Sequence, residues 1–449
     1  MKKFLSSFGP AIIVAAVVLG PGSILTSSKV GATLGLIGVP VVFFAAVLMI
    51  AMVALSARLG AVYDGSIGDE LAKRVGRPLT VVIGLVLFVL IALFQSSNNI
   101  ALVGGLEPML GDGLLSVGAR TSILVAVNLL VIGSLYYLRD LYTSVERFMK
   151  LLIGLTTVAF LVNFAVVLTT DRPSVPLARP SEFDWLPLLG MIGTTFSVAG
   201  AFYQSYLVKE KGWGMSDLRR GLMDSVIGIS VLGLVTAVIL TTSWRVFYGT
   251  PTAGSLDSVG DVAIQLEPLF GPAAKIVFCV GILAGALSSF LVNALIGGTV
   301  LSDTLGKGAR LTDRWPIHLT TVALLVGASV AIVSLIMEGS TVHLITLAQA
   351  LTVLGIPGLA LALIFLGTRE ELTGERRIPR PILIVAGIGL IVSCVLAILT
   401  ARKVYQKLST PIENASRRDV SKLDPVRPRF SSVDPELRPG VGYCVRDFV

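Results

Sequence analysis

Four consecutive residues interrupt the first apolar run of the chain: the stretch VVLGPGSILTSSKVGA contains Gly20, Pro21, Gly22 and Ser23 in its middle. Proline removes a backbone donor and disfavours a helical residue before it, and glycine lowers the cost of unwinding further. A break at this point leaves one helix end with free N–H groups and another with free carbonyl groups. These groups, together with the Ser23 hydroxyl, could hold an ion or a small polar solute.

A second interruption lies in the run WLPLLGMIGTTFSVAGAFYQSYLV, where glycines flank the polar residues Thr194, Thr195 and Ser197. A simple proline kink would account for the first interruption alone. Two glycine-rich interruptions, in the first and the sixth apolar runs, are instead the pattern of a secondary transporter that binds its substrate between broken helices. We therefore predict breaks near Gly20–Ser23 and Gly193–Gly200 that face each other near the bilayer midplane.

The elements that carry these breaks are predicted to be membrane helices. Hydrophobic residues make up 54% of the 449 residues and charged residues 14%, whereas a soluble protein carries about 25% charged residues. Runs of about 20 apolar residues, the length needed to cross a bilayer, recur along the chain. We predict an all-α polytopic membrane protein with eleven spans, at about 8–35, 40–62, 78–104, 121–138, 142–169, 186–209, 221–244, 272–300, 318–337, 343–367 and 382–400.

Lysine and arginine gather in alternate loops between these spans. The loops on the side opposite the N-terminus contain only Arg120, Arg172, Arg179 and Arg245, and the remaining loops are much more basic. Because basic loops stay in the cytoplasm, we predict a cytoplasmic N-terminus and an integral protein of the plasma (inner) membrane. The net charge of +8 is then a topology signal. We expect the lipid bilayer as a partner and no nucleic acid, and the oligomeric state stays open.

The domain organisation follows from the spans. Residues 1–401 are predicted to form one transmembrane transporter domain, with two repeats at about 8–169 and 186–367. Residues 402–449 are rich in proline, serine and arginine, which predicts a disordered tail. The three cysteines have no metal-ligand spacing, and no nucleotide-binding loop or hydrolase motif occurs. We therefore expect no cofactor and no enzymatic activity.

Several motifs resemble those of the natural resistance-associated macrophage protein (Nramp) family of divalent-metal transporters. They are FGPAIIVAAVVLGPGSILTSSKVGA, ALSARLGAVYDG, SVERFMKLLIGL, DSVIGISVLGLV, LAGALSSFLVNALIGG and LAQALTVLGIPGLAL, and the likeness covers about residues 8–400. The resemblance implies a LeuT-type fold, in which an inverted 5+5 repeat is followed by an eleventh transmembrane helix. It also implies secondary transport of divalent metal cations by alternating access.

The metal-binding motifs of that family are altered in this chain. The first broken helix of the family normally contains Asp-Pro-Gly-Asn, and here these positions are Gly20–Ser23. The sixth helix normally contains Met-Pro-His, and here the matching residues are Ser197, Val198 and Ala199. The glutamine of the tenth helix is retained as Gln349. The carboxylate, the thioether and the imidazole that would select a transition metal are therefore all missing.

The positions that the resemblance assigns to the proton route are neutral as well. The two acidic residues of the third family helix correspond to Gln95 and Asn98, and a second family histidine corresponds to Gln204. These side chains do not titrate near neutral pH. We therefore predict that proton coupling of the family type is absent.

The remaining candidates define a neutral substrate site. We expect substrate binding at Gly20, Pro21, Gly22, Ser23, Thr194, Ser197 and Gln349, and at most weak metal binding at Gly20, Ser23, Thr194 and Gln349. Dehydrating a dication with neutral oxygen ligands alone is costly. The site would suit a largely hydrated ion such as magnesium, a monovalent cation, an anion, or a neutral or zwitterionic solute. A membrane sensor that has kept the fold without transport is a further alternative.

Two charged residues near the breaks have competing interpretations. Lys29 lies about two helical turns beyond Ser23 and could attract an anionic group, or it could extend to the membrane interface. Asp224 opens the seventh span, and we expect it to pair with Arg219 or Arg220 in a structural role.

Overall fold

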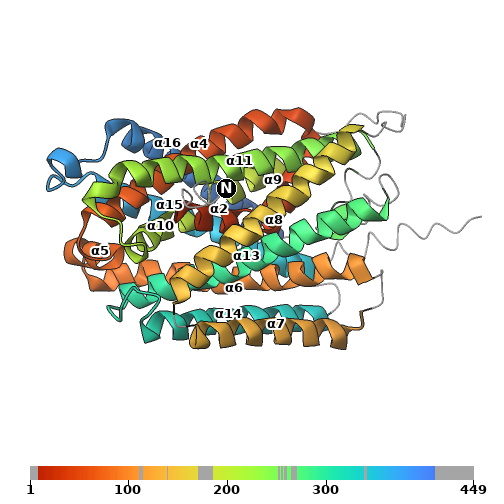
Figure 1. Ribbon diagram of the computed structural model, residues 1–449, viewed down its shortest axis with the longest axis horizontal. Helices are drawn as coiled ribbons and strands as arrows, with labels where there is room; N and C mark the ends of the chain where they lie inside the picture. The colour runs from red at the N-terminus through yellow and green to blue at the C-terminus, as the bar shows by residue number, and fades with distance from the viewer. Residues whose placement is uncertain are drawn as a thin grey trace, which may run out of the picture. The chain divides into compact units, whose positions relative to one another are not determined.

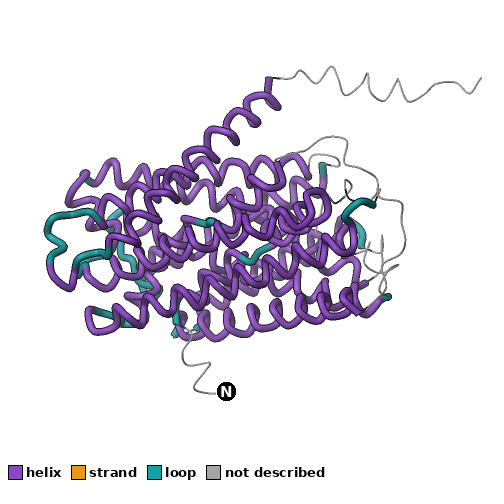
Figure 2. The backbone as a smooth tube through the Cα atoms, turned by 90° about the horizontal axis from the view of Figure 1, so that it is seen from above, coloured by secondary structure: helices purple, strands orange, loops and turns teal. Residues whose placement is uncertain are grey.

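The computed structural model describes residues 9–110, 115–138, 140–169, 186–250, 253, 256, 260–263, 271–337 and 341–409. Within these ranges the regular elements are all helices (Figure 2). Eight of the described helical segments are long and apolar enough to cross a membrane. Every predicted span contains a helix, and the spans with the two predicted breaks are each divided into two shorter helices.

The first divided span consists of α2 (Ala11–Val18) and α3 (Pro21–Leu34). Between them, Gly20 adopts an extended conformation (φ −90°, ψ −177°) and caps α3, while Pro21 occupies a first-turn position where its missing N–H group is not needed. The break lies at residues 19–20. It is therefore confirmed, slightly nearer the N-terminus than predicted, because Gly22 and Ser23 already belong to the first turn of α3.

The second divided span consists of α9 (Leu186–Thr195) and α10 (Val198–Glu210). Ser197 stands before α10 in a non-helical conformation (φ −84°, ψ 90°). This break lies at residues 196–197, within the predicted range Gly193–Gly200. Each break consists of a buried apolar residue, Leu19 or Phe196, followed by a small one, Gly20 or Ser197.

The long helices surround these divided spans. They are α4 (Gly38–Val62), α6 (Arg77–Leu110), α7 (Val117–Tyr137), α8 (Leu141–Thr169), α11 (Leu218–Phe247), α13 (Pro272–Thr304), α14 (Arg314–Ile336), α15 (Thr341–Gly367) and α16 (Arg380–Ser409). Shorter elements connect them: η1 (Gly35–Ile37), α5 (Ile67–Val75), η2 (Met215–Asp217) and η4 (Gly374–Arg376). Helix α16 continues past the boundary predicted at residue 401, and residues 410–449 of the predicted tail lie outside the described residues.

Helix α2 is deeply enclosed among the helices of residues 1–404. All eight of its residues are at most 7% exposed, and it contacts α8, α10, α11 and α13 (Figure 1). Helix α7 lies at the edge, packed mainly on α14 and α6, and its outward leucines Leu129 and Leu130 are 60% and 72% exposed. Such apolar exposure suits lipid as the surrounding solvent.

One close approach fixes α11 against α3. A Cβ atom added at Gly31 would lie 2.2 Å from the carbonyl oxygen of Leu240, so only glycine lets the two backbones meet at this distance. The Ser243 hydroxyl donates a hydrogen bond of 2.6 Å to the carbonyl of Ser28 in the same interface. Small residues and interhelical hydrogen bonds are the usual means of packing helices in lipid.

Candidate substrate-binding site

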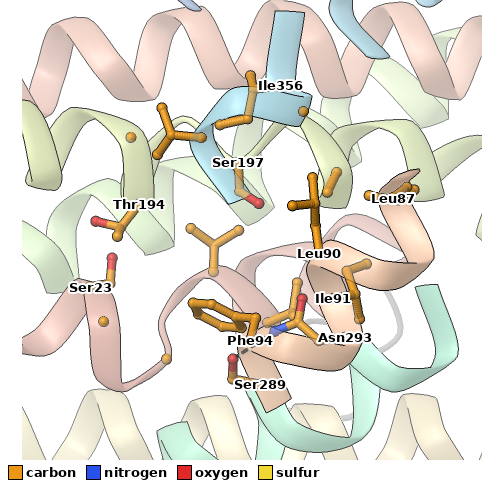
Figure 3. Close-up of a pocket in the computed structure, with 18 of the residues that line it drawn as sticks. Ser23, Leu87, Leu90, Ile91, Phe94, Thr194, Ser197, Ser289, Asn293 and Ile356 are labelled. Atoms are coloured by element: carbon orange, nitrogen blue, oxygen red, sulfur yellow. Dashed lines mark hydrogen bonds between the residues drawn. The ribbon is translucent and has the colours of Figure 1, made fainter. Parts of the chain in front are cut away.

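A cavity of about 100 Å³ lies between the two helix breaks (Figure 3). Residues from both breaks line it: Gly20, Gly22 and Ser23 on one side and Gly193, Thr194, Ser197 and Ala199 on the other. The two interruptions therefore face one cavity, as predicted. None of the residues that line the cavity is charged.

The cavity has an apolar wall opposite the breaks. Helix α6 and helix α15 form it, with Leu87, Leu90, Ile91, Phe94, Ile356 and Leu359. Figure 3 shows Leu90, Ile91 and Phe94 extending into the space between the ribbons. A bound molecule would therefore meet hydroxyl and backbone groups on one side and hydrocarbon on the other.

A hydroxyl pair joins the two breaks. Thr26 of α3 and Thr194 of α9 have their Oγ1 atoms 3.1 Å apart, and Thr26 also donates to the carbonyl of Gly22 at 2.8 Å. Ser23 is only 2% exposed, yet its Oγ has no hydrogen-bond partner among the described residues. A buried polar group without a partner is unusual in proteins, and here it lies on the cavity wall.

Helix α13 contributes two polar residues that the sequence analysis did not assign. The Asn293 amide Nδ2 donates to Ser289 Oγ at 2.9 Å, and both residues line the cavity. Figure 3 shows the Asn293 carbonyl oxygen directed away from this bond. The signal in the sequence is a pair of polar residues four positions apart in an apolar run, which places them on one helix face.

Ser289 also explains why residue 20 is small. A Cβ atom added at Gly20 would lie 2.6 Å from Ser289 Oγ and 2.7 Å from Ser289 Cβ. The space that a side chain at position 20 would need is therefore occupied by the Ser289 side chain.

Comparison with known proteins identifies the family. Residues 11–402 match the family described as natural resistance-associated macrophage protein-like. The chain belongs to the Nramp family. It is 25% identical over 422 residues to the divalent metal cation transporter MntH of Chromohalobacter salexigens, which covers 90% of this chain and 91% of that relative. It is 24% identical over 394 residues to MntH of Deinococcus radiodurans, which covers 83% of this chain and 84% of that relative.

Solved structures agree on the fold. A variant of the manganese transporter of Eremococcus coleocola matches with a TM-score of 0.74 at 17% sequence identity, over 94% of this chain and 91% of the other. At this identity the likeness establishes the Nramp fold and leaves the substrate undecided.

Gln95 and Asn98, which were predicted to replace acidic residues of the family's proton route, form part of a buried hydrogen-bond network away from the cavity wall. Gln95 Nε2 donates to the Phe290 carbonyl of α13 at 2.6 Å, and Asn98 Nδ2 donates to Gln95 Oε1 at 2.6 Å. Asn99 continues the network, because its Nδ2 donates to the Gln95 carbonyl and its Oδ1 accepts from Asn128 of α7. Amide donors therefore tie α6 to α13 and α7.

Five of the seven predicted substrate-binding residues line the cavity: Gly20, Gly22, Ser23, Thr194 and Ser197. Pro21, Lys29 and Gln204 do not line the cavity. Pro21 holds the start of α3, and Lys29 lies two turns further along the same helix. Gln204 is fully buried in α10. Gln349 lies in α15, and its side chain lies outside the described part of the chain.

Asp224 does not pair with the arginines that the sequence suggested. Its two carboxylate oxygens accept hydrogen bonds from the backbone N–H groups of Gly9 and Ala11, at 2.7 and 2.8 Å. Arg220 pairs with Asp217 instead. Asp224 therefore satisfies free donors at the N-terminus of α2, which is the favourable place for a carboxylate on a helix.

Proposed function

We propose that this Nramp-family protein is a secondary transporter that works by alternating access around a neutral central site. We also propose that its helices form an inverted 5+5 repeat, at about 8–169 and 186–367, followed by an eleventh transmembrane helix. Its place is the plasma (inner) membrane with the N-terminus in the cytoplasm. One observation carries the proposal: a cavity lies where two interrupted helices meet, and such meeting points are the substrate sites of transporters built in this way.

Membership of the family favours divalent cations of the magnesium or manganese class as substrates, since the relatives are named divalent metal cation transporters. The ligands available here are neutral: backbone carbonyls near Gly20 and Thr194, the Ser23 hydroxyl and, as an untested candidate, the Gln349 amide. No group of three or more His, Cys, Asp or Glu side chains that could hold a metal occurs among the described residues. We therefore propose weak cation binding, without the selectivity for transition metals that carboxylate and sulfur ligands provide.

The second candidate is transport of a non-metal solute or an anion. The observation that favours it is the apolar wall of α6 and α15, because a dication gains nothing from hydrocarbon side chains.

The test is uptake into proteoliposomes that contain the purified protein. Manganese, magnesium and candidate organic solutes are measured side by side, each against empty liposomes. We expect saturable uptake of at least one of them. If no solute or ion moves in exchange or along its gradient, the transport proposal is wrong, and the non-transporting sensor becomes the better explanation of the fold.

A further inference from the structure

We propose that the central cavity binds a small organic carboxylate with a short apolar tail. The inference rests on the proposed transport function and names the substrate class of the same site. Its basis is the combination of two helix N-termini, an unpartnered hydroxyl and an apolar wall around one small space.

The first step concerns the two helix N-termini. Helix α3 begins at Pro21 and helix α10 begins at Val198, and residues of both first turns line the cavity. The first intrahelical bonds run from Ile24 N–H to Gly20 and from Ala201 N–H to Ser197, so the N–H groups before them have no intrahelical acceptor. Two such ends around one cavity provide donors and positive dipole ends for an anionic group.

The second step is the Ser23 hydroxyl. It belongs to the first turn of α3, it is 2% exposed, and its Oγ lacks a hydrogen-bond partner among the described residues. In Figure 3 it points toward Thr194, across the space between the two breaks. A ligand oxygen at the N-terminus of α3 would accept from this hydroxyl and so remove an unsatisfied buried group.

The third step favours a ligand that has an apolar part. Hydrocarbon from α6 and α15 covers the opposite wall, with Leu90, Ile91 and Ile356 among the lining residues. Apolar surface of the ligand gains about 25 cal/mol per Å² when it is buried there. A carboxylate with a hydrocarbon tail would interact favourably with both the polar and the apolar wall, whereas an inorganic ion would interact favourably only with the polar wall.

The size of the cavity limits the tail. A cavity of about 150 Å³ in another protein holds benzene, which has six carbon atoms. A cavity of about 100 Å³ therefore suits a ligand such as propionate or alanine. The carbonyl ends of α2 and α9 line the same cavity, and Asn293 offers an amide oxygen, so an ammonium group beside the carboxylate also has partners.

The experiment measures binding to the purified full-length protein in lipid nanodiscs by isothermal titration. The probes are propionate, its uncharged isostere propionamide, propylamine and alanine. We expect propionate or alanine to bind at least about tenfold more tightly than propionamide, because only a carboxylate uses the helix N-termini fully. Equal binding of propionate and propionamide, or no binding of either carboxylate, would overturn the inference. Alanine against propionate distinguishes an amino acid from a simple acid.

Two variants tie the binding to the cavity. Ser23→Ala should weaken propionate or alanine binding about tenfold. Ser27→Ala is the matched control, because Ser27 lies on the same helix, is also buried, also has an Oγ without a partner among the described residues, and does not line the cavity. Ile356→Ala removes hydrocarbon from the apolar wall and so enlarges the cavity. This variant should shift the best ligand from propionate toward valerate. A loss of all binding in both serine variants would show a structural effect and contradict the assigned role of Ser23.

Flux measurements separate this inference from the transport proposal. If the protein takes up manganese or magnesium but binds no carboxylate, the transport proposal is supported and the carboxylate inference is wrong. If the protein binds a carboxylate but does not move the same compound in proteoliposomes, the binding site is supported and the transport of that compound is contradicted.

Discussion

At the scale of single residues, Gly20 and Ser289 share one space, and this bears on any attempt to restore a metal site. The added Cβ at position 20 would lie 2.6 Å from Ser289 Oγ, so an aspartate there requires a smaller residue at position 289 as well. We predict that wild-type protein binds manganese no more tightly than millimolar, a free energy of about 4 kcal/mol. The variant with Gly20→Asp, Ser23→Asn, Ser197→Met and Ser289→Gly should bind manganese more tightly, because a carboxylate offsets dehydration and sulfur favours the softer ion.

Isothermal titration of three proteins checks this prediction. The control is the same variant without Ser289→Gly, which should gain less because the new side chain at position 20 meets the serine. Micromolar manganese binding by the wild type would contradict the prediction, and would mean that carbonyl and amide oxygens suffice.

Glu70 carries a second prediction at the residue scale. It lies in the first turn of helix α5, outside the spans, and it is 5% exposed. Burial by itself raises the pKa of Glu70, but hydrogen bonds from Lys73 and Arg74, both at 2.7 Å, more than offset this and hold the pKa below its ordinary value. A carboxyl group with a lowered folded pKa stabilises the fold above its unfolded pKa of about 4.3, and this stabilisation is lost as the pH falls through the folded pKa.

We therefore predict that Glu70→Gln destabilises the protein at pH 7 by about 1 kcal/mol, a value at the low end for charged hydrogen bonds because Lys73 is exposed. The difference from wild type should be constant from about pH 8 to about pH 5.5 and should shrink at lower pH. Thermal unfolding in nanodiscs across this range measures it. A difference that grows as the pH falls would contradict a lowered pKa of Glu70 in the folded protein.

At the scale of elements, Asp224 links α11 to the N-terminus of α2. Its carboxylate is 3% exposed and accepts from two backbone N–H groups, and the neighbouring Gly228 lies against Ala11 so closely that an added Cβ would be 3.0 Å from the Ala11 backbone. We predict that Asp224→Ala releases the first turn of α2. Removing the partner of two buried donors costs about 1–3 kcal/mol, so local opening should become about tenfold or more frequent.

Hydrogen exchange at residues 9–18 measures that opening. Asp217→Ala is the control, because Asp217 directly precedes α11 and pairs with the exposed side chain of Arg220. Unchanged exchange in α2 of Asp224→Ala would show that packing alone holds this helix.

The same elements show which features the sequence predicts. The breaks were predictable because proline and glycine act locally, and the spans were predictable because their length follows from the bilayer. Helix α5 was not predicted, although Ser66 caps it by accepting from the Asp69 N–H group at 3.2 Å, a signature that is visible in the sequence. The hydrocarbon walls and the Ser289–Asn293 pair depend on how distant helices pack. Asp224 was assigned to nearby arginines because the α2 backbone donors it meets are more than 200 positions away in sequence.

At the scale of the whole molecule, the cavity lining is uncharged, and so are Gln95 and Asn98, the residues predicted for the family's proton route. Gln95 and Asn98 donate amide hydrogens within the network that ends on the Phe290 carbonyl. A deprotonated carboxylate at either position would have no hydrogen to donate, so the network would lose one hydrogen bond. Asp303 accepts hydrogen bonds from the Gly68 N–H group and the Tyr206 hydroxyl. Four carboxylates are buried among the described residues, and none of them lines the cavity: Glu70, Glu146, Asp224 and Asp303.

We therefore predict that substrate uptake leaves the pH of the liposome lumen unchanged and that an imposed pH gradient does not accelerate uptake. The physical reason is that amides do not titrate near neutral pH, and that none of the four buried carboxylates lines the cavity. A pH-sensitive dye enclosed in proteoliposomes measures lumenal pH during uptake, with empty liposomes and a protonophore as controls. Acidification in proportion to uptake would contradict the prediction. Asp224→Asn and Asp303→Asn would then show whether either carboxylate carries the proton, because only the variant that lacks the carrier should take up substrate without acidification.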